Sequence, residues 1–270
     1  MNTKPIDTWR GKWALVTGAS AGIGTALARE LAAGGTNLIL TARRQDRLEA
    51  LAAQLAAAHK ISTEIVVADL RQPDAPPSIF AFTQQKKINV DLLINNAGYG
   101  GYGEFFRSDL QWQLGMVQVN CGAVVHLTHL YLPEMVERRA GGILIVASTA
   151  AFQPVPYIST YAATKAFDLL FAEGLAEEMK PYGVRVCALC PGSTESEFRQ
   201  VAKQTQVPAS NRKQEPADKV ARAGLQALAA GRSYVISGVG NYLGTHAERL
   251  MTRRTVARIA AKMFRPQKSR

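Results

Sequence analysis

The feature that most constrains the fold is a regular alternation between short apolar runs and longer segments of helical composition. The first run, 13–17, ends in glycine-rich sequence, and the helical stretch 22–33 that follows it stops at Gly34-Gly35. Six further strand-sized runs continue the pattern, at 37–42, 61–69, 90–95, 142–148, 184–190 and 233–237.

Segments of helical composition lie between these runs, at 45–58, 110–137, 157–180 and 216–230. Strands that alternate with helices, and are apolar along their whole length, imply a parallel sheet that is covered on both faces. The sequence therefore predicts one doubly wound α/β domain over residues 1–240, with a Rossmann-like, seven-stranded parallel sheet and helices on both faces. Ligands are expected at the carboxyl ends of its strands.

The composition agrees with a folded domain in a reducing compartment. The chain has 270 residues, of which 47% are hydrophobic and 3 are cysteines, and this excludes both a mostly disordered chain and a disulfide scaffold. The longest apolar stretches are strand-sized, and the polar N-terminus does not resemble a signal peptide. We therefore expect a cytoplasmic protein.

The turn after the first predicted strand has the character of a phosphate-binding loop. It reads Thr17-Gly18-Ala19-Ser20-Ala21-Gly22-Ile23-Gly24 and runs directly into a helix. Glycines let the backbone approach a ligand closely, and a helix N-terminus offers unpaired N–H groups with a partial positive charge. The position of this turn favours nucleotide binding over an ordinary strand-to-helix connection.

The end of the second predicted strand indicates which dinucleotide is bound. Sites for NAD usually place a carboxylate here to hold the ribose 2′-hydroxyl, but this chain reads Thr41-Ala42-Arg43-Arg44. The Arg43 guanidinium can pair with a 2′-phosphate through two parallel hydrogen bonds. The alternative is a solvated basic pair at the start of a helix, where cations are unfavourable. The residues therefore predict NADP(H) rather than NAD(H).

Tyr161 and Lys165 are four residues apart in a predicted helix and so share one face. A nearby ammonium favours the phenolate, so we expect the pKa of Tyr161 to lie below its usual value of about 10. Such a phenol can act as an acid or base near neutrality. Ser148 closes the fifth predicted strand at the carboxyl edge, where its hydroxyl can donate to a developing oxyanion. Taken alone, a Tyr–Lys pair at this spacing more often forms a solvated face.

In this order along the chain, these features resemble the short-chain dehydrogenase/reductase family over about residues 10–240. The elements that match are the glycine turn 17–24, Asp69, Asn95-Asn96-Ala97-Gly98, Asn120, Ser148, Tyr161 with Lys165, and Pro191-Gly192.

The resemblance implies an NADP(H)-dependent enzyme that interconverts a carbonyl and an alcohol by hydride transfer. Tyr161 would be the acid or base, and Lys165 would bind the nicotinamide ribose and tune Tyr161. Ser148 would bind the substrate oxygen, and Asn120 would hold a water in the proton relay. The expected cofactor-binding residues are Gly18, Ser20, Gly22, Ile23, Gly24, Arg43, Arg44, Asp69, Leu70, Asn96, Ala97, Gly98, Tyr161, Lys165, Pro191, Gly192 and Thr194.

Two patterns that suggest a metal or redox site have simpler interpretations. Cys187 and Cys190 are three apart in a predicted strand, so they point to opposite faces and are expected to be buried thiols. His126 and His129 have no acidic ligand nearby in the sequence. We therefore expect no metal site.

The sequence specifies the substrate less closely than it specifies the reaction. Apolar side chains near the predicted cleft favour a moderately apolar, small-molecule carbonyl or alcohol as the substrate; they are Phe105, Phe106, Phe152, Val155 and Tyr157. The polar stretch 195–215 has the composition of a lid. The alternative function is a non-catalytic NADP(H)-binding regulator or scaffold of the same fold, against which the complete set of proton-relay residues argues.

The basic character of the chain is concentrated in a C-terminal helical extension, 241–270. Eight basic residues and one acidic residue fall in this extension, so it carries +7 of the net charge of +11 and leaves +4 for the first 240 residues. The stretch 245–264 has helical composition. Its predicted basic stripe is Arg254, Arg258, Lys262 and Arg265, and its predicted apolar face is Leu250, Ala257, Ala261 and Phe264.

Three interpretations of this extension compete. It lies on an anionic membrane surface, packs on a neighbouring subunit, or forms a solvated terminal helix. The family resemblance suggests a homo-oligomer, either a dimer or a tetramer. Nucleic acid is not expected, because no aromatic interleaving or binding motif accompanies the charge.

Overall fold

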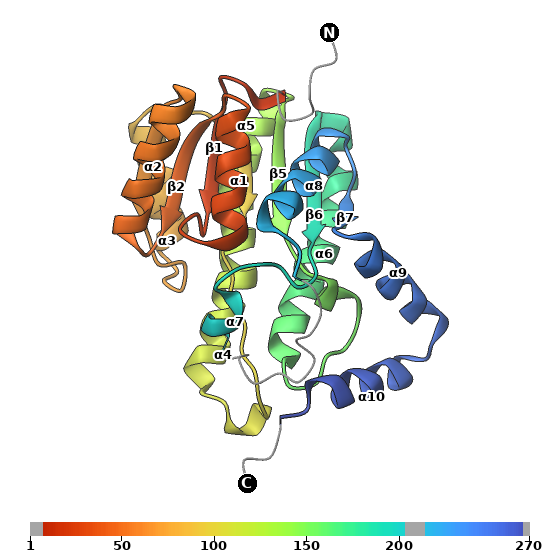
Figure 1. Cartoon of the computed structure of the whole chain (residues 1–270). Helices are drawn as coiled ribbons and strands as arrows, with labels where there is room; N and C mark the ends of the chain where they lie inside the picture. Colours follow the sequence, from red (N-terminus) through yellow and green to blue (C-terminus); the bar gives the residue numbers. More distant parts are fainter. Residues whose placement is uncertain (1–7, 203–213, 267–270) are drawn as a thin grey trace.

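The computed structural model describes residues 8–202 and 214–266, which form one parallel sheet with helices on both faces (Figure 1). The sheet has seven strands in the order β3-β2-β1-β4-β5-β6-β7, so the predicted fold class is confirmed. The strands are β1 (Trp13–Thr17), β2 (Asn37–Ala42), β3 (Thr63–Val67), β4 (Val90–Asn95), β5 (Gly141–Val146), β6 (Val184–Cys190) and β7 (Tyr234–Ile236).

The helices are divided between the two faces of the sheet. One core packs α1, α2 and α8 against the strands, and the other packs α3, α5 and α6. Within the described residues, the helices are α1 (Gly22–Ala33), α2 (Gln45–His59), α3 (Ala75–Gln85), α4 (Leu110–Val117), α5 (Ala123–Glu137), α6 (Ser159–Met179), α7 (Phe198–Val201), α8 (Ala217–Ala229), α9 (Val239–Ala247) and α10 (Arg253–Phe264).

The two cores follow from the period-two alternation of the strands. In β1, Val16 is buried in the core of α1 and Leu15 in the core of α5. Cys187 and Cys190 of β6 are also buried in opposite cores, and both are free thiols. The strand order reverses between β1 and β4, so the carboxyl ends of the strands border a crevice at this point.

Besides shifts of one or two residues at the ends of other elements, two predicted elements differ from the structure within this domain. The predicted helix 110–137 is interrupted by a π-helical turn, Gln118–Gly122, which contains Asn120. Such turns are frequent at functional sites. The predicted strand 61–69 is shorter, because β3 lies at the edge of the sheet and pairs only with β2, from Thr63 to Val67.

The prediction of one helix over 245–264 is wrong. The chain instead forms α9, a short 3₁₀ turn and α10, which begins after Thr252. The Thr252 hydroxyl accepts a hydrogen bond from the Thr255 amide at 3.3 Å, so this residue caps a new helix. Because the helix restarts here, the buried face of α10 is formed by Val256 and Ala260, whereas Leu250 is 90% exposed.

No helix among residues 8–202 and 214–266 is both long and apolar enough to cross a membrane. The N-terminal stretch 1–7, the central part of the predicted lid, 203–213, and the last part of the extension, 267–270, lie outside the described residues.

Candidate active site

The glycine turn forms one wall of a cavity at the carboxyl edge of the sheet. Gly18 and Gly22 have φ values of +66° and +54°, which side chains rarely allow. A Cβ at Gly24 would collide with the carbonyl oxygen of Gly18, so only glycine fits there. The first turn of α1 contains no acidic side chain and no side-chain cap. Its backbone N–H groups are therefore available to an anion.

Asn96 ties the end of β4 to this turn. Its side-chain Nδ2 donates to the Thr17 carbonyl oxygen at 2.7 Å, and its backbone N–H donates to the Thr17 hydroxyl at 2.9 Å. The Ala97 amide donates to the same hydroxyl at 2.9 Å. These bonds leave little room at Gly18, where a Cβ would lie 2.9 Å from the Ala97 Cα. The turn and the β4 loop are thus fixed as one unit.

Two arginines follow β2, and their surroundings differ. The Arg44 guanidinium donates to the Ser20 hydroxyl at 3.2 Å and to Glu197 at 2.8 Å. Arg43 is exposed and lines the cavity, and no hydrogen bond or ion pair joins it to another described residue. Arg43 is therefore the cation that is available to a bound anion.

Glu197, which the sequence did not single out, bridges Arg44 and Arg47. Its carboxylate lies 2.8 Å from Arg44 Nη1 and 2.6 Å from Arg47 Nη1. Hydrogen bonds from Arg47 and Arg44 hold the pKa of Glu197 below its usual value. The residue belongs to the predicted lid segment, so the described part of this segment is anchored beside the glycine turn.

Asp69 and Leu70 follow β3 and line the cavity. The Asp69 carboxylate accepts hydrogen bonds from Arg71 Nε at 2.9 and 3.2 Å. The Arg71 guanidinium keeps the pKa of Asp69 below its usual value. Leu70 is buried.

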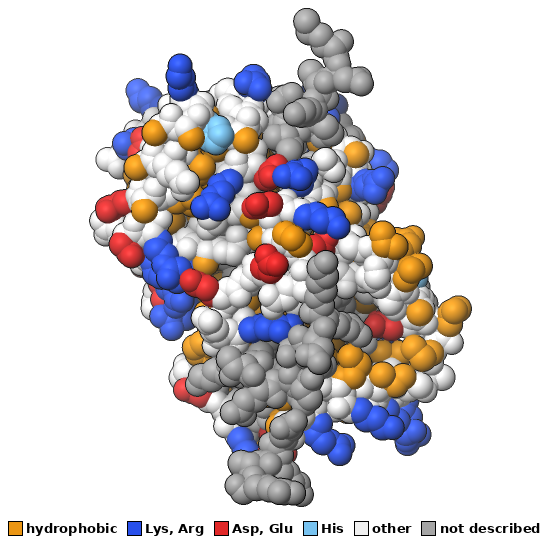
Figure 2. Space-filling model, in the orientation of Figure 1, with side chains coloured by type: hydrophobic (Ala, Val, Ile, Leu, Met, Phe, Trp, Pro, Cys, Tyr) orange, Lys and Arg blue, Asp and Glu red, His pale blue; other side chains and the backbone are white. Residues whose placement is uncertain are grey.

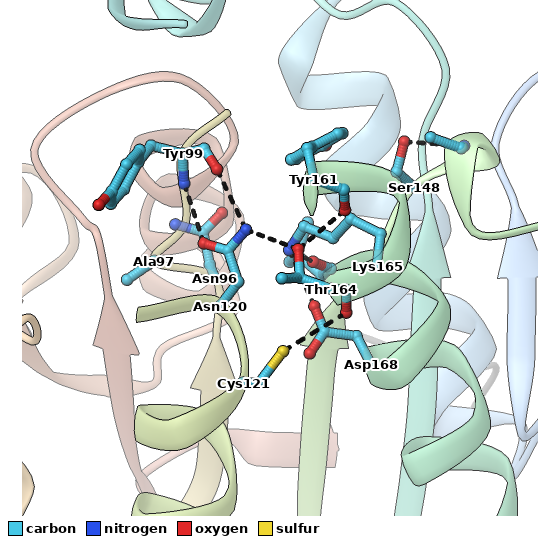
Figure 3. A network of polar contacts seen from close by, with 12 residues as sticks. Asn96, Ala97, Tyr99, Asn120, Cys121, Ser148, Tyr161, Thr164, Lys165 and Asp168 are labelled. Carbon is cyan, nitrogen blue, oxygen red and sulfur yellow. Dashed lines mark hydrogen bonds and ion pairs between the residues drawn. The ribbon is translucent and has the colours of Figure 1, made fainter. Parts of the chain in front are cut away.

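Tyr161, Lys165 and Ser148 meet on the opposite wall (Figure 3). The first turns of α6 carry Tyr161 and Lys165, and Ser148 follows β5. The Lys165 ammonium lies 6.0 Å from the centre of the Tyr161 ring. It donates to the Val146 carbonyl oxygen at 2.7 Å and thereby joins α6 to β5.

Asp168 is a second partner of this ammonium that sequence reasoning missed. Its Oδ2 lies 2.9 Å from Lys165 Nζ, and the two side chains are only 1% and 6% exposed. The other carboxylate oxygen has no hydrogen-bond partner among the described residues. A signal was present in the sequence, since a carboxylate three residues after a lysine on a helix lies on the same face.

The expectation that the pKa of Tyr161 lies below its usual value is wrong for this structure. Burial raises the pKa of Tyr161, and the opposing effects of the Lys165 ammonium and the Ser148 hydroxyl do not reverse the rise. The Asp168 carboxylate raises it further. Burial alone would lower the pKa of Lys165, but Asp168 and Tyr161 more than offset this effect and raise it. Spacing predicted the lysine's effect, but not the burial that outweighs it.

Asn120 lies behind this site, in the π-helical turn. Its Oδ1 accepts from the Tyr99 amide at 3.1 Å, and its Nδ2 donates to the Tyr99 carbonyl oxygen at 3.1 Å and to the Thr164 hydroxyl at 3.0 Å. A Cβ at Gly98 would lie 3.2 Å from Asn120 Oδ1 and 3.4 Å from Lys165 Nζ, so all three meet at one point.

The cavity has a volume of about 1340 Å³ and gathers residues that are far apart in the sequence. All of the predicted site residues line it except Gly24 and Asn120, which pack directly behind Gly18 and Gly98. Pro191, Gly192 and Thr194 reach it from the end of β6.

Helices α9 and α10 form an outer wall of the same cavity, which the sequence did not indicate. Ala260 is buried in a cluster with Val155 and Ile158, and the Tyr102 hydroxyl donates to the Phe264 carbonyl oxygen at 2.9 Å. An extension that packs on its own domain in this way is not a fully solvated helix. The residues of α10 that line the cavity are Val256, Ile259, Ala260, Met263 and Phe264.

Most of the apolar residues that were predicted to line the cleft lie elsewhere. Val155 does line the cavity, but Phe152 packs against Tyr234 with ring centres 6.2 Å apart. Phe105, Phe106 and Tyr157 line a smaller, neighbouring pocket, which shares Ile158 and Tyr161 with the main cavity. In their place, Phe198 of α7 covers the site, with its ring centre 5.2 Å from that of Tyr161.

Comparison with known proteins places this site in a family. Residues 12–207 match the family model described as short chain dehydrogenase. Over 190 residues, the chain is 36% identical to a very-long-chain 3-oxoacyl-CoA reductase of Bos taurus, with 69% of this chain and 60% of that protein covered. Over 187 residues, it is 34% identical to the inactive hydroxysteroid dehydrogenase-like protein 1 of Homo sapiens, with coverages of 67% and 55%.

The chain spans about three fifths of the length of the curated relatives it matches. Among solved structures, a short-chain dehydrogenase from Sphingobium yanoikuyae in complex with NADPH superimposes with a TM-score of 0.79 at 28% identity, covering 88% of this chain and 94% of that chain. The family match and these relatives agree with the fold. The chain belongs to the short-chain dehydrogenase family.

Proposed function

We propose that the protein is an NADP(H)-dependent oxidoreductase that interconverts a carbonyl and an alcohol on an apolar substrate. The observation that carries this proposal is the position of Ser148, Tyr161 and Lys165 between a glycine-lined cradle and an apolar wall in one cavity. The family suggests the class of reaction, and the residues of this chain support the choice of cofactor, the proton donor and the apolar substrate.

The cradle fits a phosphorylated dinucleotide. Gly18 and Gly24 leave no space for a side chain, and the start of α1 offers uncapped N–H groups to a pyrophosphate. The exposed Arg43 guanidinium, which has no ion-pair partner among the described residues, suits a 2′-phosphate. When bound, NADPH supplies the hydride. The solved relative that contains NADPH supports the same choice of cofactor.

The raised pKa of Tyr161 suits carbonyl reduction. Burial keeps the phenol protonated at neutral pH, so its hydroxyl can give a proton to the substrate oxygen. Ser148 donates a hydrogen bond to the same oxygen as negative charge develops on it. Lys165, held by Asp168 and by the Val146 carbonyl oxygen, stabilises the phenolate that remains.

The apolar wall favours a substrate with an extended hydrocarbon part. Val155, Ile158 and the inner face of α10 line the substrate side of the cavity. Its volume of about 1340 Å³ exceeds the ~300–1,000 Å³ that is typical of a site for one small ligand. It therefore leaves space beside a dinucleotide. The name of the bovine relative, a very-long-chain 3-oxoacyl-CoA reductase, supports a long acyl chain that carries a ketone.

We further propose a homo-oligomer in the cytoplasm. Exposed apolar side chains gather on the neighbouring helices α4 and α6, and such a patch is typical of a subunit interface. They are Leu110, Leu114, Val117, Phe167 and Leu170. The buried free thiols of Cys187 and Cys190 agree with a reducing compartment.

Tyr161→Phe is expected to lower turnover by ~10²–10⁴-fold, because the proton donor is lost, while NADPH binding is unchanged. The measurement is the loss of NADPH absorbance with a panel of ketones that includes 3-oxoacyl thioesters, together with a fluorescence titration of NADPH. Tyr182→Phe is the matched control, since this exposed tyrosine lines neither of the two pockets. Identical baselines without NADPH consumption for wild type and Tyr161→Phe, with NADPH still bound by both, would favour a binding-only regulator or scaffold.

Arg43→Ala is expected to weaken NADPH binding by ~10–100-fold and to leave NADH binding nearly unchanged, because only NADPH carries the 2′-phosphate. Titration calorimetry with both cofactors measures the two dissociation constants. Arg29→Ala is the control, because this exposed arginine does not line the cavity. Equal losses for the two cofactors would refute the assignment of Arg43.

Asp168→Asn is expected to move the rising limb of the pH profile for alcohol oxidation to lower pH. In this direction Tyr161 must be deprotonated to act as the base, and Asp168 raises its pKa. The measurement is kcat/KM with NADP as a function of pH, with thermal unfolding as a check of the fold. Glu177→Gln, which removes an exposed charge from the same helix, is the control. A profile that does not move in folded Asp168→Asn would contradict the argument.

A further inference from the structure

An exposed apolar patch covers the outer face of α9 and the elbow between α9 and α10. Its largest exposures are those of Leu250 at 90%, Val239 at 77% and Leu243 at 62%. Figure 2 shows hydrophobic side chains gathered over this corner of the molecule. We call this the tail patch; its members are Val239, Tyr242, Leu243, Leu250, Met251 and Ile259.

A row of cations borders the tail patch. Arg254, Arg258, Lys262 and Arg265 are exposed on the side of α10 that is opposite Val256 and Ala260. No acidic side chain pairs with any of the four among residues 8–202 and 214–266. Figure 2 shows basic side chains along the edge of α10, next to the hydrophobic ones. We call these four residues the basic row.

The tail patch also reaches the mouth of the main cavity. Met251 and Ile259 belong to the patch, and both line the cavity while remaining at least 40% exposed. The inner side of the same two helices contributes Thr245, Val256 and Met263 to the lining. One apolar surface therefore continues from the outside of the extension into the cavity.

We propose that α9 and α10 dock on an anionic phospholipid bilayer and present the cavity mouth to it, so that an apolar ketone enters from the lipid. The basic row matches the phosphate and carboxylate groups of lipid headgroups, and the tail patch is removed from water by the interface. The docking itself stands on the surface alone, whereas the entry of a ketone rests on the proposed function.

The arrangement of charge favours a bilayer over a second copy of this chain. In a two-fold contact, the same surface of both copies meets, and the extension of each copy brings eight basic residues and one acidic residue, Glu248. A second copy therefore adds positive charge to this surface without neutralising the basic row. An anionic lipid surface neutralises the row instead.

Sedimentation of the full chain with lipid vesicles tests the docking. We expect binding to vesicles that contain phosphatidylserine, weaker binding to pure phosphatidylcholine, and release at high salt. The charge reversal Arg254→Glu/Arg258→Glu/Lys262→Glu and the double variant Leu243→Ser/Leu250→Ser are each expected to weaken vesicle binding by about tenfold or more.

A matched triple variant controls for net charge. Lys60→Glu/Arg185→Glu/Arg232→Glu makes the same change in charge at exposed positions near the amino ends of β3, β6 and β7. We expect it to bind vesicles like the wild type. Equal losses in the two triple variants, or equal binding to neutral and anionic vesicles, would overturn the docking. The oligomeric state of the basic-row and tail-patch variants is measured by analytical ultracentrifugation. If a variant changes the oligomeric state but not vesicle binding, the surface serves self-association, and the proposed docking on a bilayer is overturned.

Two substrates separate this inference from the proposed function. We expect the basic-row variant to reduce a short, water-soluble ketone at the wild-type rate, and to lose rate on a long-chain ketone dissolved in anionic vesicles. Equal rates on the vesicle substrate would refute entry from the lipid. If neither substrate is reduced by the wild type, the proposed function fails, and the sedimentation result still decides the docking.

Discussion

The Lys165 ammonium is the interaction on which the rest of the site depends. By donating to the Val146 carbonyl oxygen and to Asp168, it fixes the start of α6 against the end of β5. Tyr161 is one turn earlier on α6, and Ser148 follows β5, so the same contact sets the position of both hydroxyls. A buried ammonium is unfavourable without a charged partner. Asp168 supplies that partner inside the protein.

The same pair shows why burial, rather than sequence spacing, decides the ionisation of the site. Four-residue spacing places an ammonium near the phenol and predicts a lower pKa for Tyr161. In the folded chain, loss of water around the phenol has the larger effect, and Asp168 cancels part of the effect of Lys165. Neither the depth of burial nor the partner of Lys165 was inferred from the motif. The sequence predicts in which direction the Lys165 charge shifts the pKa of Tyr161, but it does not predict the net shift that results from opposing effects.

The sheet was predictable because its strands are apolar on both faces and are separated by glycine and proline signals, as at β1 and the turn after it. The glycine turn was equally clear, since its φ values and close contacts demand glycine. The structure of the extension was not predictable, because one capping residue, Thr252, begins a new helix and changes which side chains face inward. The bridge from Glu197 to Arg44 and Arg47 also escaped prediction, because about 150 residues separate its ends.

The residues proposed to carry the chemistry and the outer apolar wall of the cavity come from different stretches of the chain. The glycine turn, Ser148, Tyr161 and Lys165 all fall within residues 12–207, which match the family model. The apolar wall of α9 and α10 begins at Val239, beyond that match. Membership of the family therefore informs the reaction, whereas the size and shape of the cavity depend in part on the extension. Because the inner sides of these helices line the cavity, while α9 exposes apolar side chains and α10 exposes basic ones, the shape of the cavity and the surface at its mouth both depend on the same two helices.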